Sequence, residues 1–219
     1  MMQDSSRMTD NLPDARRPLT SRSTPWAQFL SRAVMRAGVT PDAISILSVV
    51  FAIVGAAVLL SGGKPWNLLI CAACVQLRLL CNLLDGMVAI EGGLKSKLGV
   101  LYNEVPDRIA DSLFLVALGY ACGFPWIGWL AALAAAVTAY IRVLGGTFGL
   151  AQDFRGPFAK PHRMAAMTVG LLMAFGEYFW TGGRLALVTA AALIAFGSIV
   201  TCGTRIAAIA RQLEARPDP

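Results

Sequence analysis

The chain has few charged residues for its length. Of its 219 residues, 15% are charged, whereas 56% are hydrophobic. Soluble domains carry about 25% charged and about 45–50% apolar residues, so this composition excludes an ordinary soluble domain and a disordered chain. The formal net charge of +6 is typical of a protein whose basic residues face the cytoplasmic side of a membrane. We therefore expect membrane lipids, and no nucleic acid, as its surroundings.

Histidine and cysteine are also scarce. The chain has one histidine, His162, and five cysteines that all fall within apolar stretches. Cys71 and Cys74 form a C-x-x-C pair, but no second pair accompanies it, so we expect packing residues and no zinc site. Residues 1–20 are polar and contain no apolar segment, which predicts that there is no cleaved signal peptide.

Long apolar segments dominate the rest of the chain. Crossing about 30 Å of hydrocarbon takes roughly 20 mostly apolar residues in a helix. Three stretches contain no charged residue: Ala43–Leu60, Phe124–Ile141 and Leu185–Cys202. Three more carry charge near one end: Trp66–Leu84, Asn103–Gly123 and Met164–Trp180. The sequence therefore predicts an all-α integral membrane protein with six transmembrane helices.

The positions of the basic residues predict how these helices are oriented. With the N-terminus in the cytoplasm, the outer turns contain only Lys64 and Arg184 as basic residues. The positive-inside rule then places both termini on the cytoplasmic side of a multi-pass protein of a bacterial inner or plasma membrane.

A further pattern precedes the first span. Apolar residues in Trp26–Ala37 alternate with Arg32 and Arg36, which predicts a short amphipathic helix in the headgroup layer. The predicted organisation is a disordered cytoplasmic tail (1–23), a juxtamembrane amphipathic helix (24–41), a six-helix transmembrane catalytic domain (42–207) and a cytoplasmic tail (208–219).

Small and polar residues gather where the second span ends and the third begins. Successive residues of a helix are rotated by about 100°, so the small and polar residues within each span share one helix face. They are Asn82, Asp85, Gly86 and Ala89 on the second span, and Asn103, Glu104, Asp107 and Asp111 on the third. The loop between the spans is short, so the two faces can meet near the cytoplasmic interface, which places the predicted active site there.

This cluster indicates a site for a cation and a phosphate. Charged residues at membrane depth usually mark a working site, and oxygen ligands without His or Cys favour hard ions such as Mg²⁺ or Mn²⁺. Gly86 and Ala89 leave room for a ligand beside the backbone. These features suggest a lipid substrate that bears a diphosphate. There are two alternatives. One is an ion pathway lined by acids. The other is a set of helix-end charges that extend to the membrane interface, but Asp111 lies one turn too deep for this.

The residues resemble the signature of the CDP-alcohol phosphotransferases, D-x-x-D-G-x-x-A-R followed after about eight residues by G-x-x-x-D-x-x-x-D. The chain has Asp85-Gly86-x-x-Ala89 and then Asp107-x-x-x-Asp111, and the resemblance covers residues 38–165. It implies an enzyme of phospholipid biosynthesis. Such an enzyme transfers a phosphatidyl group from a CDP-diacylglycerol-like donor to an alcohol acceptor and releases CMP.

The chain departs from this signature at two positions. Asn82 stands where the first aspartate is expected, and Ile90 stands where the arginine is expected. Asparagine still offers an oxygen but carries no charge, so the affinity for a metal is expected to fall unless Glu104 compensates. Arg108 is a candidate replacement for the lost phosphate contact.

Two registers of the second half of the signature are open. Strict spacing makes Asn103 and Asp107 the third and fourth acids. The alternative makes Asp107 and Asp111 these acids, with one more helical turn after Gly99, and it is favoured by the fit of Ala110 and of the apolar run that follows.

The resemblance implies a role for each candidate residue. Two divalent ions, Mg²⁺ or Mn²⁺, would be the cofactor, held by Asn82, Asp85, Asp107 and Asp111, with Asn103 and Glu104 as alternative ligands. The nucleotide would lie against Asn82, Gly86 and Ala89. Asp111 would be the catalytic base, because it would accept the proton of the acceptor hydroxyl.

Basic residues follow the fourth span. By resemblance, Arg142 and Lys160 would hold phosphate groups of the substrates, and Arg163 is a further candidate; cytoplasmic loops are, however, often basic without a binding role. Arg78 is predicted to pair with an acid. Members of the family commonly form homodimers, so a homodimer is a candidate assembly.

Two other interpretations stay open. A small transporter could use the same acids, although the apolar spans offer few polar residues near the middle of the membrane. Asn82 and Ile90 also fit a catalytically silent relative. The sequence does not identify the acceptor alcohol.

Overall fold

The computed structural model describes residues 24–62, 64–94 and 98–216. Within these ranges the protein consists of helices without strands, which confirms the predicted all-α class. The helices are α1 (Pro25–Arg36), α2 (Pro41–Ser61), α3 (Trp66–Glu91), α4 (Gly99–Cys122), α5 (Pro125–Thr147), α6 (Lys160–Trp180) and α7 (Leu185–Glu214).

Proline and glycine set several helix boundaries. Helices α1, α2 and α5 each begin with a proline, whose missing N–H and fixed φ suit the first helical position. The backbone N–H of Ala43 donates to Thr40 Oγ1 at 3.3 Å and so caps α2. Helix α4 ends at Gly123, whose φ of 87° lies in the left-handed region that favours glycine.

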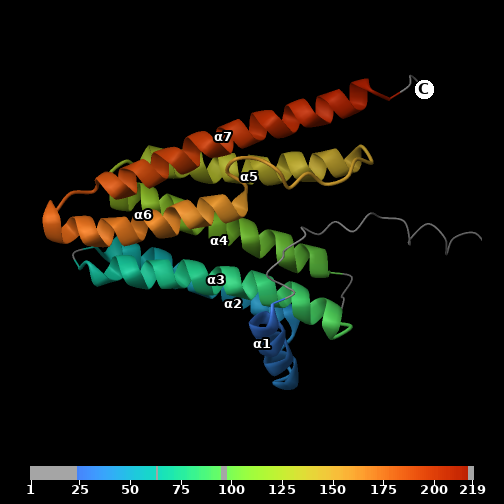
Figure 1. The fold of residues 1–219 in the computed structure, drawn as a ribbon, viewed down its shortest axis with the longest axis horizontal. Coiled ribbons are helices and arrows are strands. Elements are labelled where there is room, and N and C mark those ends of the chain that lie inside the picture. Colours follow the sequence, from blue (N-terminus) through green and yellow to red (C-terminus); the bar gives the residue numbers. More distant parts are fainter. Residues whose placement is uncertain (1–23, 63, 95–97, 217–219) are drawn as a thin grey trace, which may run out of the picture.

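The six longer helices run lengthwise and form one bundle (Figure 1). Helix α2 packs on α3 and α4, α4 packs on α5, and α7 packs on α5 and α6. Gly119 and Gly128 bring α4 and α5 into close contact, since a Cβ added to Gly119 would lie 2.6 Å from the Gly128 Cα. Small residues are what allow membrane helices to approach so closely.

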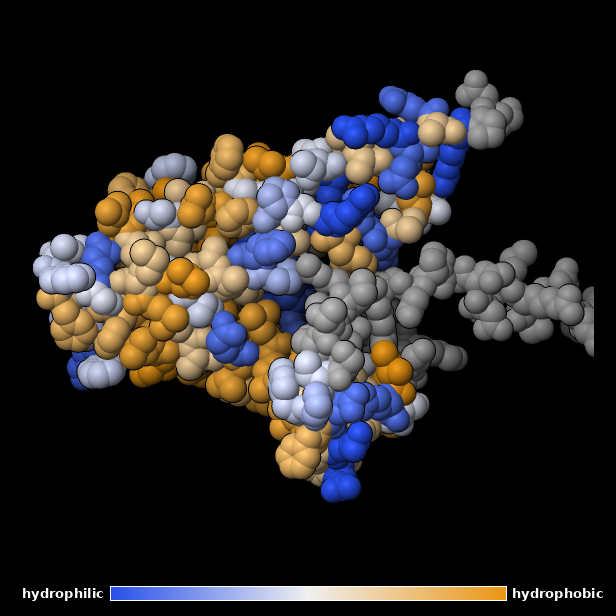
Figure 2. All heavy atoms as spheres, in the orientation of Figure 1, coloured by the Kyte–Doolittle hydropathy of each residue, from blue (hydrophilic) through white to orange (hydrophobic). Residues whose placement is uncertain are grey.

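Four helices, α2, α3, α5 and α7, are long and apolar enough to cross a membrane, judged by length and composition. Helices α4 and α6 have similar lengths, but they carry charged residues into the bundle, among them Asp111 and Arg163. Of the six predicted spans, α2, α3, α5 and α7 are therefore supported by length and composition, whereas α4 and α6 are not. In Figure 2 hydrophobic residues cover most of the middle of the bundle, and hydrophilic residues gather at its ends.

The structure also bears on the ends of the chain. Helix α1 covers the stretch predicted to be amphipathic and crosses the bundle direction (Figure 1). Its Ala27 and Ser31 are buried, whereas the side chains of Trp26 and Phe29 are largely exposed. Helix α7 continues to Glu214, so the predicted tail 208–219 begins as helix. The predicted disordered tail 1–23 lies outside the described residues.

The cysteines are packing residues, as predicted. All five are free, and four are buried. Cys71, Cys74 and Cys122 belong to the main hydrophobic core, and Cys81 packs in a smaller cluster near α1.

Candidate active site

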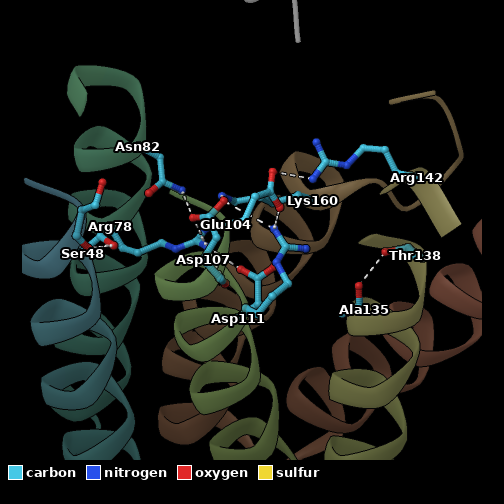
Figure 3. A network of polar contacts seen from close by, with 12 residues as sticks. Ser48, Arg78, Asn82, Glu104, Asp107, Asp111, Ala135, Thr138, Arg142 and Lys160 are labelled. Carbon is cyan, nitrogen blue, oxygen red and sulfur yellow. Dashed lines mark hydrogen bonds and ion pairs between the residues drawn. The ribbon is translucent and has the colours of Figure 1, made fainter. Parts of the chain in front are cut away.

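A cavity of about 610 Å³ opens between the C-terminal ends of α3 and α5 and the N-terminal ends of α4 and α6. One wall is apolar and includes Trp26 and Leu83, and the other is polar. The polar and small lining residues include Asn82, Asp85, Gly86, Asn103, Glu104, Asp107, Arg108, Thr138, Arg142, Lys160 and Arg163. The acids and bases of four helices thus converge on one volume (Figure 3).

Asp107 is the centre of the polar network. Its Oδ1 accepts hydrogen bonds from Arg78 Nη2 at 3.1 Å and from Asn82 Nδ2 at 2.7 Å. Its Oδ2 accepts a short hydrogen bond from Lys160 Nζ, and Arg108 Nη2 lies 3.5 Å away. The carboxylate is therefore neutralised on both oxygens by side chains from three helices.

Asp111 lies one helical turn deeper and does not line the cavity. Its side chain is 3% exposed and lies 2.6 Å from Arg78 Nη2 and 3.5 Å from Arg163 Nη2. Arg163 also donates to the Phe158 carbonyl at 2.8 Å. The predicted base is thus enclosed by two buried arginines.

Asp85 has a different environment. It is 4% exposed and lines the same cavity as Asp107. Its Oδ2 accepts a hydrogen bond from Ser45 Oγ at 2.7 Å, whereas its Oδ1 is buried and has no hydrogen-bond partner among the described residues. A buried carboxylate oxygen without a partner is costly, so this atom suits a bound cation.

The other predicted residues divide into two groups. Asn82, Gly86, Asn103 and Glu104 line the cavity, and Ala89 does not. Sequence reasoning did not identify Ser45 or Trp26. Ser45 is one of two serines, with Ser48, in an otherwise apolar first span, which was the available signal for it. Nothing in the sequence pointed Trp26 toward the cavity.

Each predicted basic residue faces an acid. Arg142 Nη2 lies 2.5 Å from Glu104 Oε1, and the Arg142 guanidinium stacks 5.1 Å from the Phe154 ring centre. Lys160 contacts Asp107, and Arg163 contacts Asp111. Arg78 pairs with both aspartates, which confirms the prediction that it pairs with an acid.

Helix α7 holds the loop that carries Lys160 into the cavity. Arg205 donates to the backbone carbonyls of Arg155 at 2.9 Å and Thr138 at 2.7 Å. Gly156 has a φ of +135°, and a Cβ there would lie 2.4 Å from Thr201 Cγ2, so only glycine fits this approach.

A local ion pair also stabilises this loop. Arg155 Nε donates to Asp153 Oδ1 at 3.0 Å. Partial burial acts to raise the pKa of Asp153, but the hydrogen bonds and positive charge of Arg155 outweigh it, and the pKa is lowered. Asp153 is therefore ionised at neutral pH.

The oxygen atoms of the cavity suit a hard cation, but fewer of them belong to carboxylates than the signature predicts. Within the described residues, no group of three or more His, Cys, Asp or Glu side chains is placed to hold a metal ion. The cavity instead combines the carboxylates of Asp85 and Asp107 with the amides of Asn82 and Asn103, and its third carboxylate, Glu104, is paired with Arg142. Oxygen donors of this kind suit Mg²⁺ or Mn²⁺, and the Asp85 Oδ1 is available to one.

The fold and this site define a class of membrane enzyme. A model of the CDP-alcohol phosphatidyltransferase family matches residues 38–205, and the chain belongs to this family. With its four apolar helices, it is an integral membrane protein.

Particular relatives refine this assignment. The phosphatidylinositol phosphate synthase of Mycobacterium marinum is 31% identical over 149 residues, which cover 64% of this chain and 62% of the relative. The crystal structure of the Mycobacterium tuberculosis phosphatidylinositol phosphate synthase with CDP-DAG bound has a TM-score of 0.69 and 26% identity, and the match covers 84% of this chain and 92% of that one. The same protein in complex with manganese and citrate also gives a TM-score of 0.69 at 26% identity, over 84% and 88% of the two chains. The chain thus matches somewhat less than two thirds of the curated M. marinum relative's length.

Proposed function

We propose that the protein transfers a phosphatidyl group from a CDP-diacylglycerol donor to a small alcohol and releases CMP. The observation that carries this proposal is the pairing of Asp85 and Asp107 in one cavity that also presents Arg142 and Lys160. Carboxylates for a divalent ion and cations for phosphates are the groups that a diphosphate substrate requires. The apolar wall with Trp26 and Leu83 suits the lipid part of such a donor.

We propose the strict register of the signature, with Asn103 in the third position and Asp107 in the fourth. Both residues line the cavity, whereas Asp111 lies beneath it between Arg78 and Arg163. In this register Asp107 is the candidate base, and the role expected of Asp111 in the sequence becomes that of a counter-ion.

The reaction is a displacement at phosphorus. The acceptor hydroxyl forms a bond to the lipid-linked phosphorus, the bond from that phosphorus to the CMP oxygen breaks, and the hydroxyl proton passes to the Asp107 carboxylate. A divalent ion, Mg²⁺ or Mn²⁺, held by Asp85 and the oxygen of Asn82, would supply charge neutralisation of the diphosphate. Gly86 leaves space for the nucleotide, and Arg142 and Lys160 orient phosphate oxygens.

We propose a phosphorylated alcohol, of the inositol phosphate type, as the acceptor. The named relatives are phosphatidylinositol phosphate synthases, and the cavity has more basic side chains than one diphosphate needs. Arg142 is the candidate for the acceptor phosphate, because its guanidinium is held at the cavity wall by Glu104 and Gln152 and can bind phosphate in a bidentate manner.

We also propose the membrane placement. Helices α2 to α7 would form six spans with both termini and the cavity on the cytoplasmic side, because Lys64 and Arg184 are the basic residues of the opposite turns. Helix α1 would lie in the headgroup layer, with Trp26 and Phe29 exposed to lipid. A homodimer stays a prediction.

Purified protein incubated with CDP-diacylglycerol and a panel of inositol phosphate, glycerol phosphate, inositol and serine tests this function. We expect CMP release with inositol phosphate and a lipid product whose mass equals the donor minus CMP plus the acceptor. Absence of CMP release with every acceptor would favour a catalytically silent relative, and substrate flux into liposomes without CMP release would favour a transporter.

A further inference from the structure

The two aspartates of the cavity are neutralised unequally. Asp107 contacts Lys160, Arg78 and Arg108, and it also accepts a hydrogen bond from Asn82. Asp85 is more than nine-tenths buried and has no ion pair among the described residues, and its Oδ1 has no hydrogen-bond partner. One carboxylate therefore already has its cations, and the other still needs one.

The formal charge of the candidate metal ligands also favours one divalent ion over two. In the strict register the signature places four carboxylates around the cations, whereas this chain has Asn82, Asp85, Asn103 and Asp107. The third carboxylate of the cavity, Glu104, is paired with Arg142. Asp85 and Asp107 together carry a formal charge of about −2, which balances one divalent ion and not two. A second divalent ion at Asp107 would also meet the positive charges of Lys160 and Arg78 at close range.

We propose that this site holds a single divalent ion, at Asp85, and that the ammonium group of Lys160 occupies the place of a second ion at Asp107. The inference rests on the proposed function, because it concerns the cation that this function requires. The Asn82 amide nitrogen donates to Asp107, so its amide oxygen is the atom that would serve as a further ligand.

Lysine can serve as such a resident cation. An ammonium group has three N–H donors, of which one contacts Asp107 Oδ2, so the others are available to a phosphate oxygen. The group is held in place because Lys160 is the first residue of α6 and its preceding loop is bound to α7 through Thr201 and Arg205. Unlike a metal ion, it cannot be removed by a chelator.

Titration of the detergent-purified full chain with Mn²⁺, followed by electron paramagnetic resonance, tests the proposal without a turnover assay. We expect one bound Mn²⁺ per chain and a spectrum without coupling between metal ions. Asp85→Asn should lose this binding while the protein keeps its elution volume and melting temperature.

Substitution of Lys160 makes the sharper test. Lys160→Met removes the resident cation, so Mn²⁺ should bind about tenfold more tightly or with a second ion per chain, because repulsion is lost and the Asp107 carboxylate is released. Lys64→Met is the matched control, since Lys64 is exposed in the turn before α3. It makes the same change of residue and net charge and should leave Mn²⁺ binding unchanged. Asn82→Asp with Asn103→Asp should restore binding of two coupled ions.

The outcomes separate this inference from the proposed function. Two results would overturn the metal–lysine arrangement: two coupled Mn²⁺ ions in the unmodified chain, or equal Mn²⁺ affinities in Lys160→Met and Lys64→Met. The proposed function would still stand if the unmodified protein released CMP. Failure to bind Mn²⁺ together with failure to release CMP would overturn both. One ion in the unmodified chain and tighter binding in Lys160→Met would support it, even if the double aspartate variant did not fold.

Discussion

Arg78 Nη2 lies 2.6 Å from Asp111 Oδ1 inside the bundle, and the same nitrogen lies 3.1 Å from Asp107 Oδ1. The Arg78 side chain has no exposed surface. One guanidinium therefore links the deep aspartate to the aspartate at the cavity wall and joins α3 to α4. Because these charges have little access to water, each depends on its partner.

Removal of Arg78 should destabilise the protein strongly. Arg78→Met leaves Asp107 short of one cation and Asp111 with only the longer contact to Arg163. Breaking a buried ion pair from one side costs about 3–5 kcal/mol, so the melting temperature in detergent should fall by many degrees. Arg211→Met, at an exposed site near the end of α7, is the control and should melt close to the unmodified protein. Similar melting of both variants would contradict the role assigned to Arg78.

The two registers of the signature make opposite predictions for Asp107 and Asp111. We expect Asp107→Asn to remain folded and to lose CMP release by about 10²–10⁴-fold, the usual contribution of a general base. Asp111→Asn should mainly lower stability, because Arg78 and Arg163 lose their shared partner. Activity per folded molecule and the melting temperature should be measured for both. Full activity in Asp107→Asn would return Asp111 to the role of base.

Arg142 should affect the acceptor more than the donor. Arg142→Gln removes the cation beside Glu104 and Phe154, so the KM for inositol phosphate should rise by roughly tenfold or more, as expected for loss of a charge-assisted hydrogen bond. The KM for CDP-diacylglycerol should change little. Steady-state kinetics with each substrate varied in turn would measure this, and equal changes in both constants would argue against an acceptor site at Arg142.

Chelation tests the need for a divalent ion. Because Asp85 Oδ1 has no partner among the described side chains, we expect EDTA to abolish CMP release and Mn²⁺ or Mg²⁺ to restore it. Ca²⁺, which prefers longer bonds and more ligands, should restore it poorly. CMP release that persists after dialysis against EDTA would argue against a divalent ion in the reaction.

Two glycines test the helix contact between α4 and α5. An alanine Cβ at Gly119 would lie 2.6 Å from the Gly128 backbone, so Gly119→Ala should push the helices apart at a cost of about 1–3 kcal/mol. Gly176→Ala is the control, because a Cβ there meets nothing within 4 Å. It should be neutral or stabilise the protein by about 0.4–1 kcal/mol. Thermal melting of both variants distinguishes a packing effect from a general effect of alanine.

The helices were predictable because each depends on local sequence. Apolar runs identified the longer helices. In the structure, prolines at positions 25, 41 and 125 begin three of the helices. The end of α7 was placed too early because charged and polar residues, Arg211, Gln212 and Glu214, return in its last turns. They continue as helix to Glu214, which hydropathy alone does not reveal.

The sequence could group most of the candidate residues that line the cavity, but it could not predict how deeply each one lies. Helical spacing correctly placed Asp107 and Asp111 on one face, yet it could not tell which of them faces the cavity. Arg78 and Arg163 decide this, because they come from other helices and enclose Asp111. The same limit applies to Ser45, whose hydrogen bond to Asp85 joins residues 40 positions apart.

The anchoring of the α5–α6 loop on α7 makes the last helix a remote determinant of chemistry. Thr201 and Arg205 fix the backbone that precedes Lys160, and Gly156 admits no larger residue against Thr201. A substitution at position 201 or 156 would therefore shift the Lys160 ammonium group without altering any residue that lines the cavity. Substitutions that impair turnover but leave the acids of the cavity unchanged should therefore be sought first at the contact between the α5–α6 loop and α7.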